Sequence, residues 1–96
     1  QLVFIGDSIT QAGETAGSNV WRDNYAQYNA VNLGISGDRT EHVLWRLKNG
    51  NLQPLHPSLA VVMIGTNNAA GSEPLNTAAG ISAIVNELNE QRPEMK

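Results

Sequence analysis

Three short apolar runs, separated by stretches long enough for helices, constrain the fold of this chain most strongly. They are Leu2–Ile5, Ala30–Leu33 and Leu59–Ile64. The first and third runs are continuously apolar rather than alternating, which is typical of parallel strands covered on both faces. The middle run is weaker because Asn32 interrupts it. Strand–helix alternation therefore predicts an α/β fold with a parallel sheet, right-handed crossovers and helices on both faces.

Two helices follow from the spacing of apolar residues. In residues 39–49 three apolar side chains share one face, and Asp38 followed by Glu41 resembles a capping box that would start this helix. A second apolar stripe runs between Pro74 and Pro93, which suit the first turn and the end of a helix. The two stripes consist of Val43, Leu44 and Leu47, and of Ile81, Ile84, Val85 and Leu88.

Composition excludes several classes of function. A chain of 96 residues forms at most one small domain, and a net charge of −3 supplies no basic surface for nucleic acid. Its longest apolar run is too short to cross a bilayer. With no cysteine and only two histidines, a metal centre is improbable. We therefore expect no metal or organic cofactor, no nucleic-acid partner and no membrane span.

The loops that follow the three apolar runs hold the candidate site. In a parallel sheet these loops lie at one edge, where ligands bind. Ser8 in "GDSIT" is either a helix cap or a nucleophile, and Gly37 in "GISGDRT" is either a turn residue or an outward-facing amide donor. Asn67 in "GTNN" either tolerates a turn or offers an uncharged NH₂ donor. Together, a hydroxyl and two amide donors at one edge favour acyl transfer.

The same three segments resemble a known family. "FIGDSIT", "NLGISGDRT" and "VVMIGTNN" are similar to the first three signature blocks of the SGNH (GDSL-type) hydrolases, and "NLGISGDRTEHVLWRLKNGNL" resembles the catalytic subunits of the type Ib platelet-activating factor acetylhydrolases. The resemblance implies a three-layer α/β/α sandwich of the flavodoxin-like type. It also implies that Ser8 is the nucleophile and an oxyanion donor through its backbone amide. Gly37 would supply a second donor through its backbone amide, and Asn67 a third through its side chain.

Neighbouring residues are expected to support these three. Asp7 is interpreted as fixing the turn before the serine by accepting backbone amides. Asp38 and Arg39 would pair with each other or with a loop of the site, and Asn68 would adjust the loop that holds Asn67.

The family's Asp-x-x-His motif, which supplies the general base and its orienting acid, is missing. His42 is expected to be structural or to support the site, and His56 to lie at the opposite end of the sheet. We therefore interpret residues 1–96 as the N-terminal part of a single domain, truncated to about three strands, whose compartment the sequence does not assign. Alone, the chain would be inactive or very weak as an esterase.

The predicted function is a serine esterase that removes short acyl groups, acetyl in particular, from a carbohydrate or phospholipid-like ester. The alternative is a catalytically incomplete or non-enzymatic binding or scaffold remnant of the same fold. A flavodoxin-like nucleotide binder would share the sheet type, but no aromatic clamp is evident. The expected partners are a small-molecule ester and a second copy of the chain, since Leu59–Ile64 would form an unpaired apolar edge.

Overall fold

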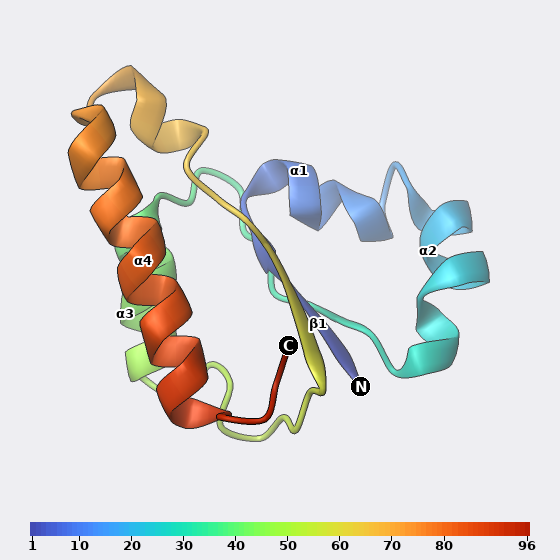
Figure 1. Cartoon of the computed structure of the whole chain (residues 1–96). Coiled ribbons are helices and arrows are strands. Elements are labelled where there is room, and N and C mark those ends of the chain that lie inside the picture. The colour runs from blue at the N-terminus through green and yellow to red at the C-terminus, as the bar shows by residue number, and fades with distance from the viewer.

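The sheet has three parallel strands, as the apolar runs predict. A computed structural model describes all residues, 1–96. Its strands are β1 (Leu2–Gly6), β2 (Val31–Asn32) and β3 (Leu59–Met63), and β1 lies between the other two in the order β2-β1-β3 (Figure 1). Each crossover between strands carries helices, so the carboxyl ends of all three strands meet at one edge.

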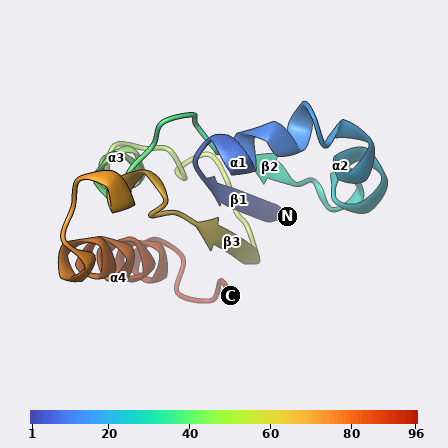
Figure 2. The same cartoon turned by 90° about the horizontal axis from the view of Figure 1, so that it is seen from above.

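Helices cover both faces of this sheet and complete three layers. The α-helices are α1 (Ser8–Gln11), α2 (Ser18–Asn24), α3 (Thr40–Lys48) and α4 (Pro74–Gln91). The short 3₁₀ turns are η1 (Ala12–Glu14), η2 (Ala26–Tyr28) and η3 (Asn67–Ala70). Seen from above, α3 and α4 lie on one side of the sheet and α1 and α2 on the other (Figure 2). The expected α/β/α arrangement is confirmed.

The hydrophobic core lies between the sheet and the pair α3 and α4. Val3 and Ile5 of β1 point to this side, and the register sets them opposite Ala60 and Val62 of β3. Seven apolar side chains are buried here: Val3, Ile5, Val43, Leu47, Leu52, Ile84 and Leu88. The predicted stripes on both helices therefore face the core, with one exception. Val85 is exposed, because it lies about 100° around α4 from Ile84.

The opposite face of the sheet is covered only in part. Phe4 of β1 packs edge-to-face on Trp21 and Tyr25, with ring centroids 5.1 Å apart in both pairs. The side chains of β3 on this same face have no such cover. Leu59, Val61 and Met63 are all exposed, so an apolar strip runs along β3.

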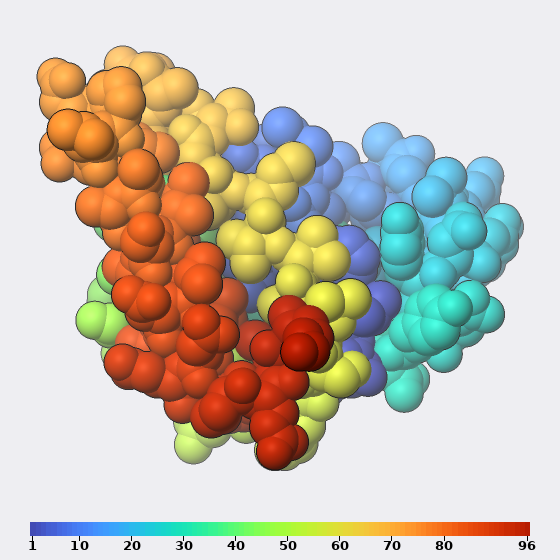
Figure 3. All heavy atoms as spheres, in the orientation of Figure 1, coloured from blue at the N-terminus to red at the C-terminus, as the bar shows by residue number.

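The outer edge of β3 differs from the expectation of a wholly unpaired strand. The Lys96 N–H donates to the Ser58 carbonyl at 3.0 Å, and the Ala60 N–H donates to the Lys96 carbonyl at 2.7 Å. This is the hydrogen-bond pattern of a parallel ladder centred on Leu59. Figure 3 shows the last residues, in red, against the yellow of β3. The edge is therefore partnered at its start and open further along.

The predicted capping box at the start of α3 is wrong. The helix begins at Thr40 after an extended Arg39, so Asp38 lies one residue too early to cap it. The Asp38 carboxylate instead forms an ion pair with Arg46, which lies in the second turn of α3. Arg46 also donates to the Leu33 carbonyl at 3.4 Å, which ties the end of β2 to α3.

No helix of the structure has both the length and the apolar character that a transmembrane span requires.

Candidate active site

Ser8 is exposed at the first position of α1, directly beyond the end of β1. The preceding Asp7 is buried and caps this short helix, accepting the Ile9 N–H at 2.9 Å. Asp7 thus accepts a backbone amide within this turn, the type of contact that the sequence predicts for it. The serine hydroxyl is therefore presented to solvent on a turn that is held from beneath by a buried carboxylate.

The loop after β2 packs directly on the backbone of this turn. Gly34 is buried there, and a Cβ atom at this position would lie 2.6 Å from the Gln11 nitrogen and 2.9 Å from the Asp7 carbonyl oxygen. The Ser36 N–H also donates to the Gln11 Oε1 at 2.8 Å. Only glycine allows the two backbones to approach so closely.

Asn32 joins the same two loops through its side chain. Its Nδ2 donates to the Thr10 carbonyl of α1 at 2.7 Å, and its Oδ1 accepts the Gly34 N–H at 2.8 Å. In the sequence, Asn32 stands out only as an interruption of an apolar run. Its position could have predicted this role. A polar side chain at the end of a strand, next to a glycine-containing loop, is partly buried and must find hydrogen-bond partners there.

Gly37 presents its backbone amide without a partner. Its φ of +83° lies in the left-handed region, and no atom lies within 4 Å of the place where a Cβ would be. The Gly37 N–H makes no hydrogen bond within the chain. An unpaired donor at an exposed position of this loop is available to a ligand.

Asn67 lies at the start of η3, beyond the end of β3, and reaches the loop after β2. Its Nδ2 donates to the Asp38 carbonyl at 2.8 Å. A carboxamide carries two N–H donors, so this bond orients the group and leaves the second hydrogen free. The neighbouring Asn68 is buried, and its Oδ1 accepts the Thr40 N–H in the first turn of α3.

Of the two alternatives for Asp38 and Arg39, the structure has contacts with other segments and not a pair between them. Arg39 lies 3.1 Å from the Glu41 carboxylate and donates to the Ser72 hydroxyl at 2.6 Å, beyond η3. The Asp38 carboxylate forms an ion pair with the guanidinium of Arg46 on α3.

The pKa of the Glu41 carboxyl is lowered from its ordinary value of 4.5. The largest cause is a hydrogen bond from the backbone N–H of Glu41 itself. Desolvation opposes the shift, and the Asn68 amide, the Arg39 guanidinium and the Thr40 hydroxyl add to it. Glu41 is therefore held as a carboxylate at the start of α3.

Neither histidine is arranged as a general base for Ser8. The His42 Nδ1 accepts the Arg39 N–H at 2.9 Å, so the neutral ring carries its proton on Nε2. Its Nε2 then has no lone pair with which to take the serine proton. His56 lies at the opposite end of the sheet, before β3 begins.

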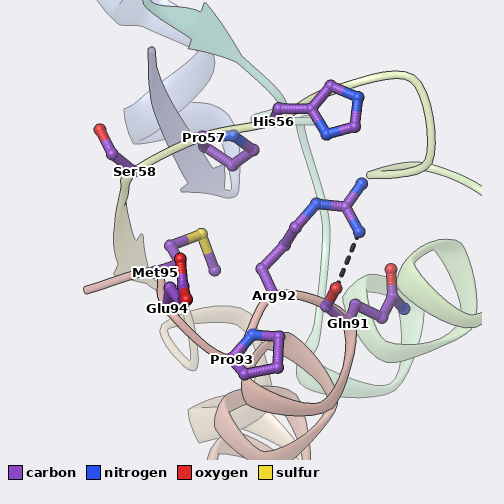
Figure 4. A pocket seen from close by; sticks show the side chains of 8 residues that line it. All are labelled: His56, Pro57, Ser58, Gln91, Arg92, Pro93, Glu94 and Met95. Atoms are coloured by element: carbon purple, nitrogen blue, oxygen red, sulfur yellow. Dashed lines mark hydrogen bonds between the residues drawn. The ribbon is translucent and has the colours of Figure 1, made fainter.

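The largest hollow of the molecule, about 480 Å³, is at this opposite end and not beside Ser8 (Figure 4). Its lining residues are His56, Pro57, Ser58, Gln91, Arg92, Pro93, Glu94 and Met95. The Arg92 guanidinium is already bonded to backbone carbonyls of Leu52, Gln53, Leu55 and Gln91. Most N–H groups of the one arginine in the hollow therefore already have backbone partners. Elsewhere in the chain, no group of three or more acidic or histidine side chains is arranged to hold a metal ion.

Comparison with known proteins identifies the family of this chain. Residues 4–96 match the model of the GDSL-like lipase/acylhydrolase family. The chain belongs to this family. The platelet-activating factor acetylhydrolase IB subunit alpha1 of Bos taurus is 43% identical over 96 residues, which are 100% of this chain and 40% of that protein. Subunit alpha2 of Rattus norvegicus is 42% identical over 95 residues, 99% of this chain and 40% of that protein.

A solved structure agrees with the fold. A GDSL-like lipase from Bacteroides thetaiotaomicron superposes with a TM-score of 0.81 at 23% identity, over 99% of this chain and 45% of that one. The chain thus spans about two fifths of the length of the curated relatives named above.

Proposed function

We propose that this chain supplies the nucleophile and the oxyanion hole of a serine acylhydrolase. Ser8 is the nucleophile, and the donors are the backbone amides of Ser8 and Gly37 and the side-chain amide of Asn67. The observation that carries the proposal is the Gly37 N–H, which has no partner in the chain and belongs to a loop packed on the Ser8 turn and bonded to Asn67. Membership of an acylhydrolase family supports the same chemistry.

The reaction follows from these groups. The Ser8 Oγ attacks the carbonyl carbon of the ester while its proton passes to a base, and the carbonyl oxygen becomes an oxyanion. The three N–H donors stabilise this charge, which does not exist in the substrate. Collapse of the tetrahedral intermediate breaks the ester C–O bond, and the alcohol leaves with the proton. Water then hydrolyses acyl-Ser8 by the same route and releases the carboxylic acid.

The base belongs to a part of the protein outside residues 1–96 in this proposal. His42 carries its proton on the nitrogen that would have to accept one, and His56 is at the wrong end of the sheet. We infer that a histidine and an aspartate from a longer chain complete the triad, and that residues 1–96 are the N-terminal part of one hydrolase domain.

We propose a short acyl ester, and an acetyl ester in particular, as the substrate. The names of the acetylhydrolase relatives support an acetyl group. The alcohol part would be a carbohydrate or a phospholipid-like group. A second copy of the chain, associated through β3, is the proposed macromolecular partner.

Hydrolysis of p-nitrophenyl acetate tests the role of Ser8. The 96-residue chain is expected to show little or no turnover above the Ser8→Ala variant. In the same protein extended beyond Lys96 to include the missing motif, Ser8→Ala should lower kcat by about a thousandfold or more. Robust Ser8-dependent turnover by the 96-residue chain would contradict an external base. Turnover in the extended protein that is unchanged by Ser8→Ala would contradict Ser8 as the nucleophile, and no turnover above the uncatalysed rate would favour a non-enzymatic scaffold.

A further inference from the structure

Asn68 is the most deeply buried amide side chain near the candidate site. It lies on η3 next to Asn67, and only 2% of its surface is exposed. A buried carboxamide without hydrogen-bond partners destabilises the fold, because its contacts with water are lost and not replaced. Its partners therefore show what it holds together.

All hydrogen bonds of the Asn68 side chain go to the first turn of α3, almost thirty residues earlier in the sequence. Its Oδ1 accepts the Thr40 N–H at 2.9 Å. Its Nδ2 donates to the Thr40 Oγ1 at 3.1 Å and to the Glu41 Oε2 at 3.2 Å. Each polar atom of the carboxamide thus has a partner, and each bond crosses from η3 to α3.

These bonds cap the N-terminus of α3. The first N–H groups of a helix have no partner within the helix, and a side chain at the cap position usually accepts one of them. Here the cap residue is Arg39, whose guanidinium can only donate. Asn68 supplies the missing acceptor for Thr40 from a distant loop.

The same bonds lie between the loops that carry two of the proposed oxyanion donors, Gly37 and Asn67. Gly37 comes three residues before Thr40, and Asn67 comes directly before Asn68. Asn67 itself donates to the Asp38 carbonyl at 2.8 Å. Two successive asparagines therefore clamp η3 onto residues 38–41, the segment that directly follows Gly37.

We propose that Asn68 is a positioning residue of the oxyanion hole. Its carboxamide bonds η3 to α3 and so keeps the Asn67 NH₂ group placed to donate to the same oxygen atom as the Gly37 amide. This inference rests on the proposed function for its purpose, but the contact itself is testable without catalysis. Asn68 does not touch the substrate in this proposal. It acts through Asn67 and through the Gly37 loop.

Nuclear magnetic resonance of the 96-residue chain tests the contact. In the unsubstituted chain, the side-chain NH₂ protons of Asn67 should give nuclear Overhauser signals to backbone protons of Asp38 and Arg39. Asn68→Ala should abolish this signal and shift the Gly37 amide resonance. Asn76→Ala, the same substitution at an exposed asparagine of α4, is the matched control and should change neither.

A double variant separates positioning from a general loss of stability. Asn68→Asp places a carboxylate beside Glu41 and removes the donor, so it should also release Asn67. Adding Glu41→Gln exchanges donor and acceptor across the same contact, and should restore the Asn67 and Gly37 signals. Circular dichroism identifies the temperature at which each variant is folded.

The outcomes are distinct. Loss of the Asn67 signal in Asn68→Ala together with its recovery in the double variant supports the proposal. An unchanged Asn67 signal in folded Asn68→Ala overturns it. If Asn68→Ala does not fold, the double variant decides: a folded double variant without the Asn67 signal overturns the proposal, and one with it supports it.

Kinetics in the extended protein then tests the purpose of the contact. Asn68→Ala should lower kcat for p-nitrophenyl acetate by about ten- to a hundredfold with little change in KM, since a donor used only in the transition state is displaced. If Ser8→Ala leaves turnover unchanged, the proposed esterase function fails, while the resonance experiment still decides whether Asn68 positions Asn67.

Discussion

At the scale of single residues, the buried polar side chains gather where loops meet. Asp7, Asp38, Thr40 and Asn68 are all buried, and each lies between the carboxyl end of a strand and the first turn of the next long helix or at that turn. Burial of a polar group is costly unless hydrogen bonds or an ion pair replace its contacts with water. Thr40 and Asn68 are partners that link segments distant in sequence, whereas Asp7 bonds within its own turn and Asp38 pairs with the helix that follows it.

The lowered pKa of Glu41 predicts a pH-dependent contribution to stability. Since the pKa is lower in the folded chain than in the unfolded one, the contribution is fully present above the ordinary value of 4.5 and is lost as the pH falls through the folded value. Glu41→Gln removes the charge. The difference in free energy of unfolding between the two proteins should be constant above pH 4.5 and shrink below it.

Urea denaturation at a series of pH values on both sides of this point measures that difference. Glu90→Gln is the control for the loss of one negative charge, because Glu90 is exposed on α4. A difference for Glu41→Gln that stays the same at all pH values would show that the carboxylate contacts at the start of α3 contribute nothing.

At the scale of secondary-structure elements, the loops are held by contacts between backbones as well as by side chains. The loop after β2 lies against the turn of α1 at Gly34, and η3 lies against α3 through Asn68. The α1 helix has only four residues and cannot be stable by itself. Its position, and with it that of Ser8, depends on what packs around it.

Gly34→Ala is expected to destabilise the chain and to move the Ser8 turn. The new methyl group would lie 2.6 Å from the Gln11 nitrogen and 2.9 Å from the Asp7 carbonyl, and backbone atoms cannot rotate away as a side chain can. Overpacking of this kind costs about 1–3 kcal/mol. Thermal or urea denaturation measures the loss.

Gly71→Ala is the matched control, because the only neighbour of a Cβ there is an Arg39 nitrogen at 3.8 Å. Its φ of −152° is not left-handed and no backbone atom is close, so alanine should cost clearly less there than at Gly34. Equal stability of Gly34→Ala and Gly71→Ala would contradict the close approach of the two loops.

At the scale of the whole molecule, the sheet is well covered on one face and thinly covered on the other. Leu59, Val61 and Met63 form an exposed apolar strip on β3, whose outer edge is bonded only near its start by Lys96. An exposed apolar strand at an open edge is a site for pairing with another chain. We therefore expect the 96-residue chain to self-associate.

Val61→Lys should reduce this association, because Val61 is 42% exposed at the middle of the strip and a charge there opposes strand pairing. Val20→Lys, at a 59% exposed valine of α2, controls for the added charge and should leave association unchanged. Light scattering over a range of concentrations measures both. A monodisperse unsubstituted chain with a cooperative melt would contradict the expectation.

Local patterns in the sequence determined the strands, the two long helices and the family. Continuous apolar runs and a 3.6-residue stripe need burial wherever they occur, so Val3, Ile5, Val43 and Leu88 could be assigned to strands and helices without coordinates. Tertiary structure decided the partners: Asp38 pairs with Arg46 rather than capping α3, and Asn68 caps it from a distant loop. Asn32 likewise bonds to α1. Hydrophobic burial is non-directional and can be read from a pattern, whereas a hydrogen bond needs two atoms at a set distance and angle, which only the folded chain brings together.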